Sequence, residues 1–202
     1  MNAQKIMDSD EFKRCEAFHG HVCGGLAIGY VAARAGLDWL RGKRALDEEL
    51  VAIVETDACC VDAIQVVTGC TLGKGNLIFR DYGKMGFTFF NRRTGQGVRL
   101  TMKPDTIRVN ERQIELFGKT RDGSITEAEN AELKTLGMQR TAEVLETPND
   151  DLFSMTPVTT GVPDKARIEP SIPCARCGEP TMGSKLASVD GQAACLACLA
   201  AD

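Results

Sequence analysis

Apolar residues recur at helical spacing in several parts of the chain and predict its longer elements. In residues 24–40 they return every three or four positions, which is typical of a helix with one buried face. Ser9 and Asp57 stand where an N-cap begins a helix, and Thr126 with Glu129 forms a capping box. The predicted helices span about residues 9–18, 24–40, 57–69 and 126–146.

Shorter apolar runs predict strands between these helices. The run Leu50–Val54 is continuously apolar and short enough for a strand that is buried on both faces. Three further runs, at residues 76–81, 86–92 and 97–102, also predict strands, and glycine-containing turns separate them. The mixture of helices and strands predicts an α+β or α/β domain.

Proline marks a change in the chain after the last long helix. Five of the seven prolines lie in residues 147–173, where they fix φ and remove amide donors. This composition predicts an extended connector with an edge strand at about 152–158. We therefore expect a core domain over residues 1–160, followed by a linker and a small cysteine-rich lobe over residues 161–202.

Charge and hydropathy narrow the classes of function. The net charge of −4 argues against nucleic-acid binding by the whole chain, and the cysteine-rich lobe carries only a few cations. No apolar run reaches the roughly 18 residues of a membrane span, and the N-terminus does not resemble a signal peptide, so we expect a cytoplasmic protein. Residues 80–121 hold ten Lys/Arg against four Asp/Glu, whereas residues 122–151 hold two against eight. This separation indicates a basic sheet edge beside an acidic solvated helix, or a surface for self-association as a homodimer.

The nine cysteines fall into two groups, five in residues 15–70 and four in residues 174–198. An odd total without a secretion signal favours metal-binding or reactive thiols over a disulfide framework. The second group forms two CxxC pairs separated by 17 residues, a spacing typical of a tetrahedral structural zinc site. The expected Zn²⁺ ligands are Cys174, Cys177, Cys195 and Cys198.

Both histidines of the chain lie with one cysteine in the segment FHGHVCGG, residues 18–25. In an extended segment His19, His21 and Cys23 point to the same side, and in a helix His19 and Cys23 still share a face. Cys23 and Cys59 each open a predicted helix, so both can face one cleft. Imidazoles with thiolates suit a second Zn²⁺ or another thiophilic metal with an open coordination position. The alternative is that these cysteines are small buried packing residues.

Asp62 follows Cys59 on the same predicted helix. We expect it to act as a catalytic base or as a partner that orients a metal ligand. Stabilisation of the first helical turn by an acidic side chain is an equally simple role for it.

The segments FHGHVCGGLAIGY and DACCVDAIQVVTGCTLGKGNLIFRDYGK, with a four-cysteine tail, resemble the E-subunit family of formylmethanofuran dehydrogenase. The resemblance implies a thioredoxin-like mixed-sheet core flanked by helices, a metal site in a cleft of that core, and a C-terminal treble-clef-like zinc finger. It also implies association with molybdenum or tungsten enzyme subunits. By motif, the family's GHxC and Cys-x-x-Asp elements correspond to His21, Cys23, Cys59 and Asp62, and His19 precedes them.

Three functions follow from these observations. The first is a metal-binding protein that is accessory to a redox enzyme, with one structural and one core metal site. The second is a metal-dependent hydrolase or transferase that acts alone, with Asp62 in its chemistry. The third is a protein-interaction module that binds its partner through the zinc finger.

Overall fold

The computed structural model describes residues 2–107, 109–189 and 191–201 of the chain. It divides into two compact units, Met1–Lys165 and Ala166–Asp202. The division falls five residues after the expected end of the core domain, inside the proline-rich connector. No helix in the described ranges is long and apolar enough to cross a membrane.

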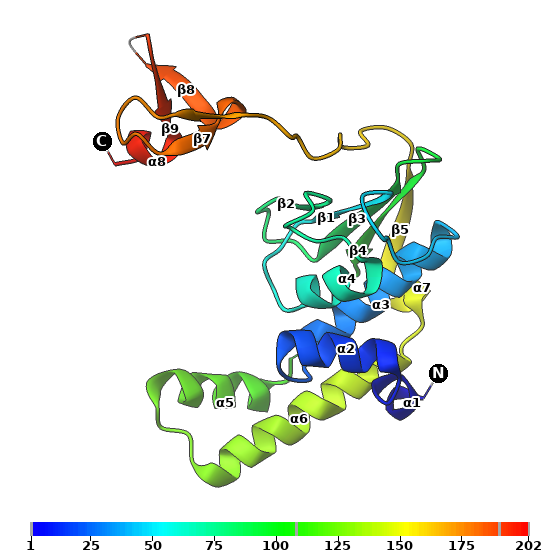
Figure 1. Cartoon of the computed structure of the whole chain (residues 1–202). Coiled ribbons are helices and arrows are strands. Elements are labelled where there is room, and N and C mark those ends of the chain that lie inside the picture. The colour runs from blue at the N-terminus through cyan, green and yellow to red at the C-terminus, as the bar shows by residue number, and fades with distance from the viewer. Residues whose placement is uncertain (1, 108, 190, 202) are drawn as a thin grey trace. The chain divides into compact units, whose positions relative to one another are not determined.

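The first unit contains a five-stranded mixed sheet (Figure 1). β1 pairs in parallel with β2 and antiparallel with β3, and the order across the sheet is β2-β1-β3-β4-β5. As predicted, β1 is buried along its whole length and β5 lies at a sheet edge, where its proline is tolerated. The strands are β1 (Leu50–Val54), β2 (Leu77–Phe79), β3 (Gly86–Asn91), β4 (Gly97–Met102) and β5 (Phe153–Val158).

The helices of the first unit lie on one side of this sheet, with α3 and α4 against it and α2 and α6 beyond them (Figure 1). Alternate strand residues such as Val54 and Phe87 point into the large core between the sheet and the helices. Val51, Ile53 and Phe90 form a smaller cluster on the other face. The helices are α1 (Ala3–Met7), α2 (Asp10–His19), α3 (Gly24–Trp39), α4 (Cys60–Thr68), α5 (Glu111–Asp122), α6 (Glu127–Glu146) and α7 (Asn149–Leu152).

Most predicted helix ends are confirmed. Ser9 accepts a hydrogen bond from the Phe12 amide at 3.2 Å and caps α2, and Gly69 ends α4 with a φ of 72°. One prediction was wrong, because α4 begins after Cys59 rather than Asp57. Thr56 and Asp57 have no regular structure, and Ala58 and Cys59 lie in a bend and a turn, so Asp57 precedes the helix by two residues more than predicted.

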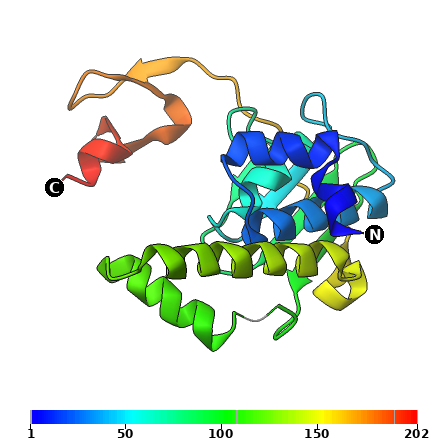
Figure 2. The same ribbon diagram turned by 90° about the horizontal axis from the view of Figure 1, so that it is seen from below.

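α5 and α6 form a helical hairpin, and Figure 2 shows α5 folded back beside the longer α6. The apolar pattern did not predict α5, although Asn110 and Gln113 make a full capping box at its start. Arg112 pairs with Glu132 at 2.7 Å, and Lys119 pairs with Glu129. Part of the separated charge along the sequence is therefore paired within this hairpin.

The second unit is a small lobe of two hairpins and a final helical turn. β6 (Ser171–Pro173) pairs with β7 (Pro180–Met182), and β8 (Leu186–Val189) pairs with β9 (Gln192–Cys195). A 3₁₀ turn joins the hairpins at Gly183–Lys185, and α8 spans Leu196–Leu199. Its apolar cluster is formed by a few side chains around the cysteines, which is too little core for a lobe of this size to be stable alone.

Candidate functional site

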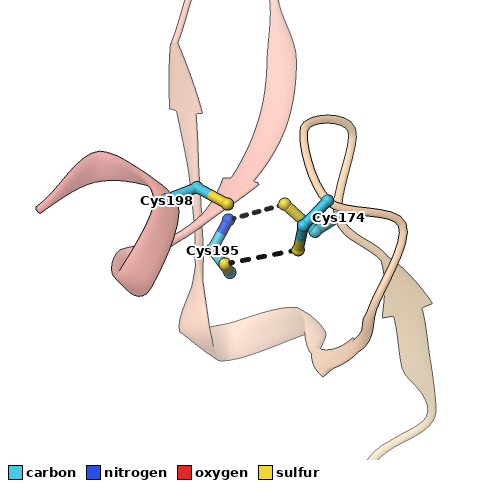
Figure 3. Close-up of side chains that lie close together, drawn as sticks. Cys174, Cys195 and Cys198 are labelled. Atoms are coloured by element: carbon cyan, nitrogen blue, oxygen red, sulfur yellow. Dashed lines mark hydrogen bonds between the residues drawn. The ribbon is translucent and has the colours of Figure 1, made fainter. Parts of the chain in front are cut away.

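The four C-terminal cysteines converge in the second unit, as Figure 3 shows for Cys174, Cys195 and Cys198. One pair lies on the turn between β6 and β7, and the other lies at the junction of β9 and α8. All four sulfur atoms lie within 4.8 Å of one another, and the sulfurs of Cys177 and Cys195 are 4.0 Å apart. A tetrahedral shell with metal–sulfur bonds of about 2.3 Å places sulfurs about 3.8 Å apart, so the donor set fits a metal ion.

Backbone amides favour thiolate in this cluster. The amides of Cys195 and Arg176 donate to the Cys174 sulfur at 3.2 Å and 3.4 Å. Hydrogen bonds from the amides of Cys177, Cys195 and Arg176 lower the pKa of Cys174 to about 6. The neighbouring thiols of Cys195 and Cys177 raise the pKa of Cys198 to about 12. A bound metal ion would oppose the raised pKa of Cys198, because metal binding favours deprotonated thiols.

The histidines and Cys23 form a second group of donor atoms in the first unit. His19 is the last residue of α2, and Gly20 ends that helix in the left-handed region with a φ of 92°. The resulting turn brings the chain back, so that donor atoms of His19, His21 and Cys23 lie within 4.8 Å of one another. The Nε2 atom of His19 is 3.7 Å from the Cys23 sulfur. For a tetrahedral ion with ordinary metal–nitrogen and metal–sulfur bonds this separation is about 3.6 Å.

Asp62 fixes the orientation of His19. Its carboxylate oxygen is 2.7 Å from Nδ1 of His19, which leaves Nε2 toward Cys23. A carboxylate on the outer ring nitrogen is the usual support of a metal-ligating histidine. The contact joins the end of α2 to the first turn of α4.

Cys23 and Cys59 lie at the starts of adjacent helices, as the sequence predicts. Cys23 is the N-cap of α3, and its sulfur accepts a hydrogen bond from the Leu26 amide at 3.3 Å. Cys59 is the N-cap of α4 but is outside the three-residue group of donor atoms. Burial, and then the Cys23 thiol, raise the pKa of Cys59. A Cβ added at Gly25 would lie 3.0 Å from the Cβ of Cys59, so this glycine allows the two helix starts to approach.

The other three cysteines of the first unit are buried in its core. Burial raises the pKa of Cys15 and of Cys60 to about 12, and that of Cys70 to about 11. These thiols are protonated at neutral pH and act as small apolar side chains.

A pocket of about 930 Å³ opens beside the histidine–cysteine group. His21, Cys23 and Cys59 line one end, and methionine, leucine, isoleucine and phenylalanine side chains make up much of the remaining wall. The pocket continues toward the α5–α6 hairpin, which contributes Lys134 and Arg140. Neither cation was predicted from the sequence. Asp62 is absent from the described lining of this pocket.

Comparisons with known proteins agree with this architecture. The family described as "FmdE, Molybdenum formylmethanofuran dehydrogenase operon" matches residues 18–154. A probable S-adenosyl-L-methionine-binding protein of Archaeoglobus fulgidus is 31% identical over 182 residues, which cover 86% of this chain. The chain spans about half of that relative, 49% of its length.

Among solved structures, the chain is similar to a tungsten formylmethanofuran dehydrogenase FmdE-like protein from Syntrophus aciditrophicus. The TM-score is 0.62 at 22% identity, and the match covers 99% of this chain and 93% of the other. This likeness supports the fold over both units. From the family match over most of its length, we conclude that the chain belongs to the FmdE family.

Proposed function

We propose that this chain is a metal-binding accessory protein of a redox enzyme, with a structural Zn²⁺ in the second unit and a thiophilic metal in the first. The observation that carries the proposal is the presence of two separate groups of soft donor atoms. The four cysteines form one group, and His19, His21 and Cys23 form the other. Nitrogen and sulfur donors of this kind select zinc and similar ions over hard cations.

The proposed structural role of the first ion follows from the small core of the second unit. Metal binding supplies folding energy to lobes that bury little apolar surface. Two CxxC turns joined by hairpins support a treble-clef-like finger, and the mixed sheet with helices supports a thioredoxin-like core. Both of these finer fold descriptions are part of the proposal.

In the first unit, His19, His21 and Cys23 would hold the ion, and we propose the adjacent Cys59 as a fourth donor. With Cys59 bound the shell is closed, and with only the three donors of the described group the ion would supply a Lewis acid at the end of the pocket. Asp62 holds the proton on Nδ1 of His19 and so presents Nε2 as a donor. The proposed role of Asp62 is therefore to position His19.

The family description and the FmdE-like structural neighbour support a molybdenum or tungsten enzyme as the partner. A cytoplasmic location and a homodimer belong to the same proposal. Purification of the tagged chain from its native cells tests it, because a molybdenum or tungsten enzyme should be recovered with the chain. Recovery of the chain without such an enzyme, under conditions in which that enzyme is produced, would contradict the accessory role.

A metal-dependent hydrolase or transferase is the second candidate, favoured by the pocket beside Cys23 and Cys59. An activity screen with ester, amide and phosphate substrates tests it. Turnover that disappears with Cys23→Ser and survives Cys60→Ala would favour catalysis over an accessory role. An interaction module with a metal-free core is the third candidate. Metal analysis distinguishes it from the other two, because its first unit should hold no metal.

Metal content per chain tests the central proposal. We expect about two metal ions per wild-type chain, one lost with Cys174→Ser and a different one lost with Cys23→Ser. Cys60→Ala is the matched control, because this thiol is buried in the core and belongs to neither donor group. Unchanged metal content in Cys23→Ser would exclude the core site and leave the finger site standing.

A further inference from the structure

The pocket of the first unit is lined by an arginine, Arg140, whose side chain is not fully paired within the described residues. The Nε atom of Arg140 is buried and has no hydrogen-bond acceptor in the described parts of the chain. Buried polar groups of folded proteins are nearly always paired, so this group favours a partner from outside the chain. The arginine also lines the pocket, where a ligand can reach it.

The surroundings of Arg140 add to its positive potential. Its side chain packs over Gly24, with its Cγ, Cδ and Nε atoms 3.5 Å from the position of an added Cβ. Gly24 begins the 16-residue helix α3, whose N-terminal end carries a partial positive charge. Lys134 lines the same pocket from the same helix as Arg140, α6. Along the described lining there is no aspartate or glutamate to neutralise these cations.

The rest of the lining is apolar and adaptable. Three methionines, Met85, Met102 and Met138, lie around the space together with aliphatic and aromatic side chains. Methionine walls adjust to ligands of different shape. A volume of about 930 Å³ is within the range of pockets that enclose small organic ligands.

We propose that this pocket binds an organic anion, with a carboxylate or phosphate head group on Arg140 and an apolar body against the methionines. The guanidinium offers the charge-assisted, two-pronged contact that such oxyanions take. The ligand then lies beside His21, Cys23 and Cys59, so the inference extends the proposed function by naming the ligand class of the same site. The Arg140 contact itself does not need the metal.

Two fluorescent probes that share an apolar body and differ in their head group, one charged and one uncharged, test the proposal on the full-length protein. We expect pyrenebutyrate to bind about 10- to 100-fold more tightly than the uncharged pyrenebutanol, because only the carboxylate pairs with Arg140. Arg140→Gln should abolish this preference, and the matched control Arg80→Gln, an exposed arginine away from the pocket, should retain it. Equal binding of the two probes by the wild type, or a preference that survives Arg140→Gln, would overturn the proposal.

A second pair of variants tests the pocket without removing the arginine. A side chain added at Gly137 or at Gly118 meets open space, but only Gly137 lines the pocket. Gly137→Leu should therefore weaken both probes at least tenfold, whereas Gly118→Leu should bind them as the wild type does. Equal binding by both leucine variants would place the probes elsewhere and contradict the pocket assignment.

Competition and metal removal separate the remaining outcomes. Displacement of pyrenebutyrate by decanoate or by decyl phosphate supports the site and identifies the preferred head group, and displacement by neither contradicts it. The probe preference should persist after chelation, with metal content measured on the same samples. An intact preference in untreated protein that holds no metal in its first unit would leave this inference standing while the proposed core metal fails, and a preference lost on chelation would contradict the inference. Probe binding that disappears as the chain self-associates would assign the pocket to a second copy instead.

Discussion

Gly29→Ala should destabilise the first unit, because α3 and α4 pack with almost no space at this residue. A Cβ built at Gly29 would lie 2.0 Å from the Cys60 carbonyl oxygen and 2.6 Å from its Cα atom. Ordinary contact begins at 3.4 Å, so α4 must retreat by about 1.4 Å. Overpacking against the backbone costs up to about 3 kcal/mol, and alanine recovers about 1 kcal/mol of helix propensity. We expect a net loss of about 2 kcal/mol in the free energy of unfolding.

The same displacement should disturb the candidate core metal site. The starts of α3 and α4 carry Cys23 and Cys59, and Asp62 of α4 holds His19 at 2.7 Å. A retreat of α4 that moves Asp62 more than 1 Å away from His19 would lengthen this 2.7 Å contact beyond hydrogen-bond range. Gly29→Ala should therefore lose metal from the first unit and retain it in the second.

Urea unfolding followed by the fluorescence of Trp39 measures this effect, because the chain has one tryptophan and it lies on α3. Gly118→Ala is the matched control, since an added Cβ at that helical glycine meets nothing within 4 Å. The control should gain up to about 1 kcal/mol from helix propensity. A stability of Gly29→Ala equal to or above that of the wild type would refute the packing argument.

Two further predictions concern polar contacts. Asp62→Ala removes the group that orients His19 and should lower the metal affinity of the core site about 10- to 100-fold, as measured by chelator competition. Asp57→Ala is the control. Equal metal affinities of the two variants would contradict the positioning role of Asp62. Glu55→Gln breaks the pair in which Arg99 donates at 2.9 Å and 2.8 Å, and should cost about 1–3 kcal/mol at neutral pH. Arg99 lowers the pKa of Glu55 from its ordinary 4.5, so this stability is present above that pH and lost below it. The gap between wild type and Glu55→Gln should close in acid unfolding curves, and a gap that stays constant or widens would argue against the ion pair.

Local sequence signals predicted much of the fold. Thr126 with Glu129 marked the start of α6, and the glycine after α4 marked its end, because capping depends on residues a few positions apart. The helix α5 was missed despite its capping box. Its apolar Ile114 and Phe117 are largely exposed, so the segment lacks a strong buried stripe.

The candidate site was predictable only where its residues are close in sequence. The approach of His19 to Cys23 follows from a separation of four residues with a glycine turn between them. The contact between Asp62 and His19 spans 43 residues, and no local spacing specifies it. Arg140 comes from α6, far along the chain, and its position over Gly24 depends on the packing of α6 against α3. Such long-range pairs arise from tertiary packing rather than from local pattern.

Anomalous diffraction at the zinc edge, from crystals of the full chain grown with zinc, distinguishes two metal sites from one. We expect two peaks per chain. One should lie among the four sulfurs of Cys174, Cys177, Cys195 and Cys198. The other should lie between Nε2 of His19 and the Cys23 sulfur, within bonding distance of His21. A peak in the four-cysteine cluster alone would contradict the core metal site.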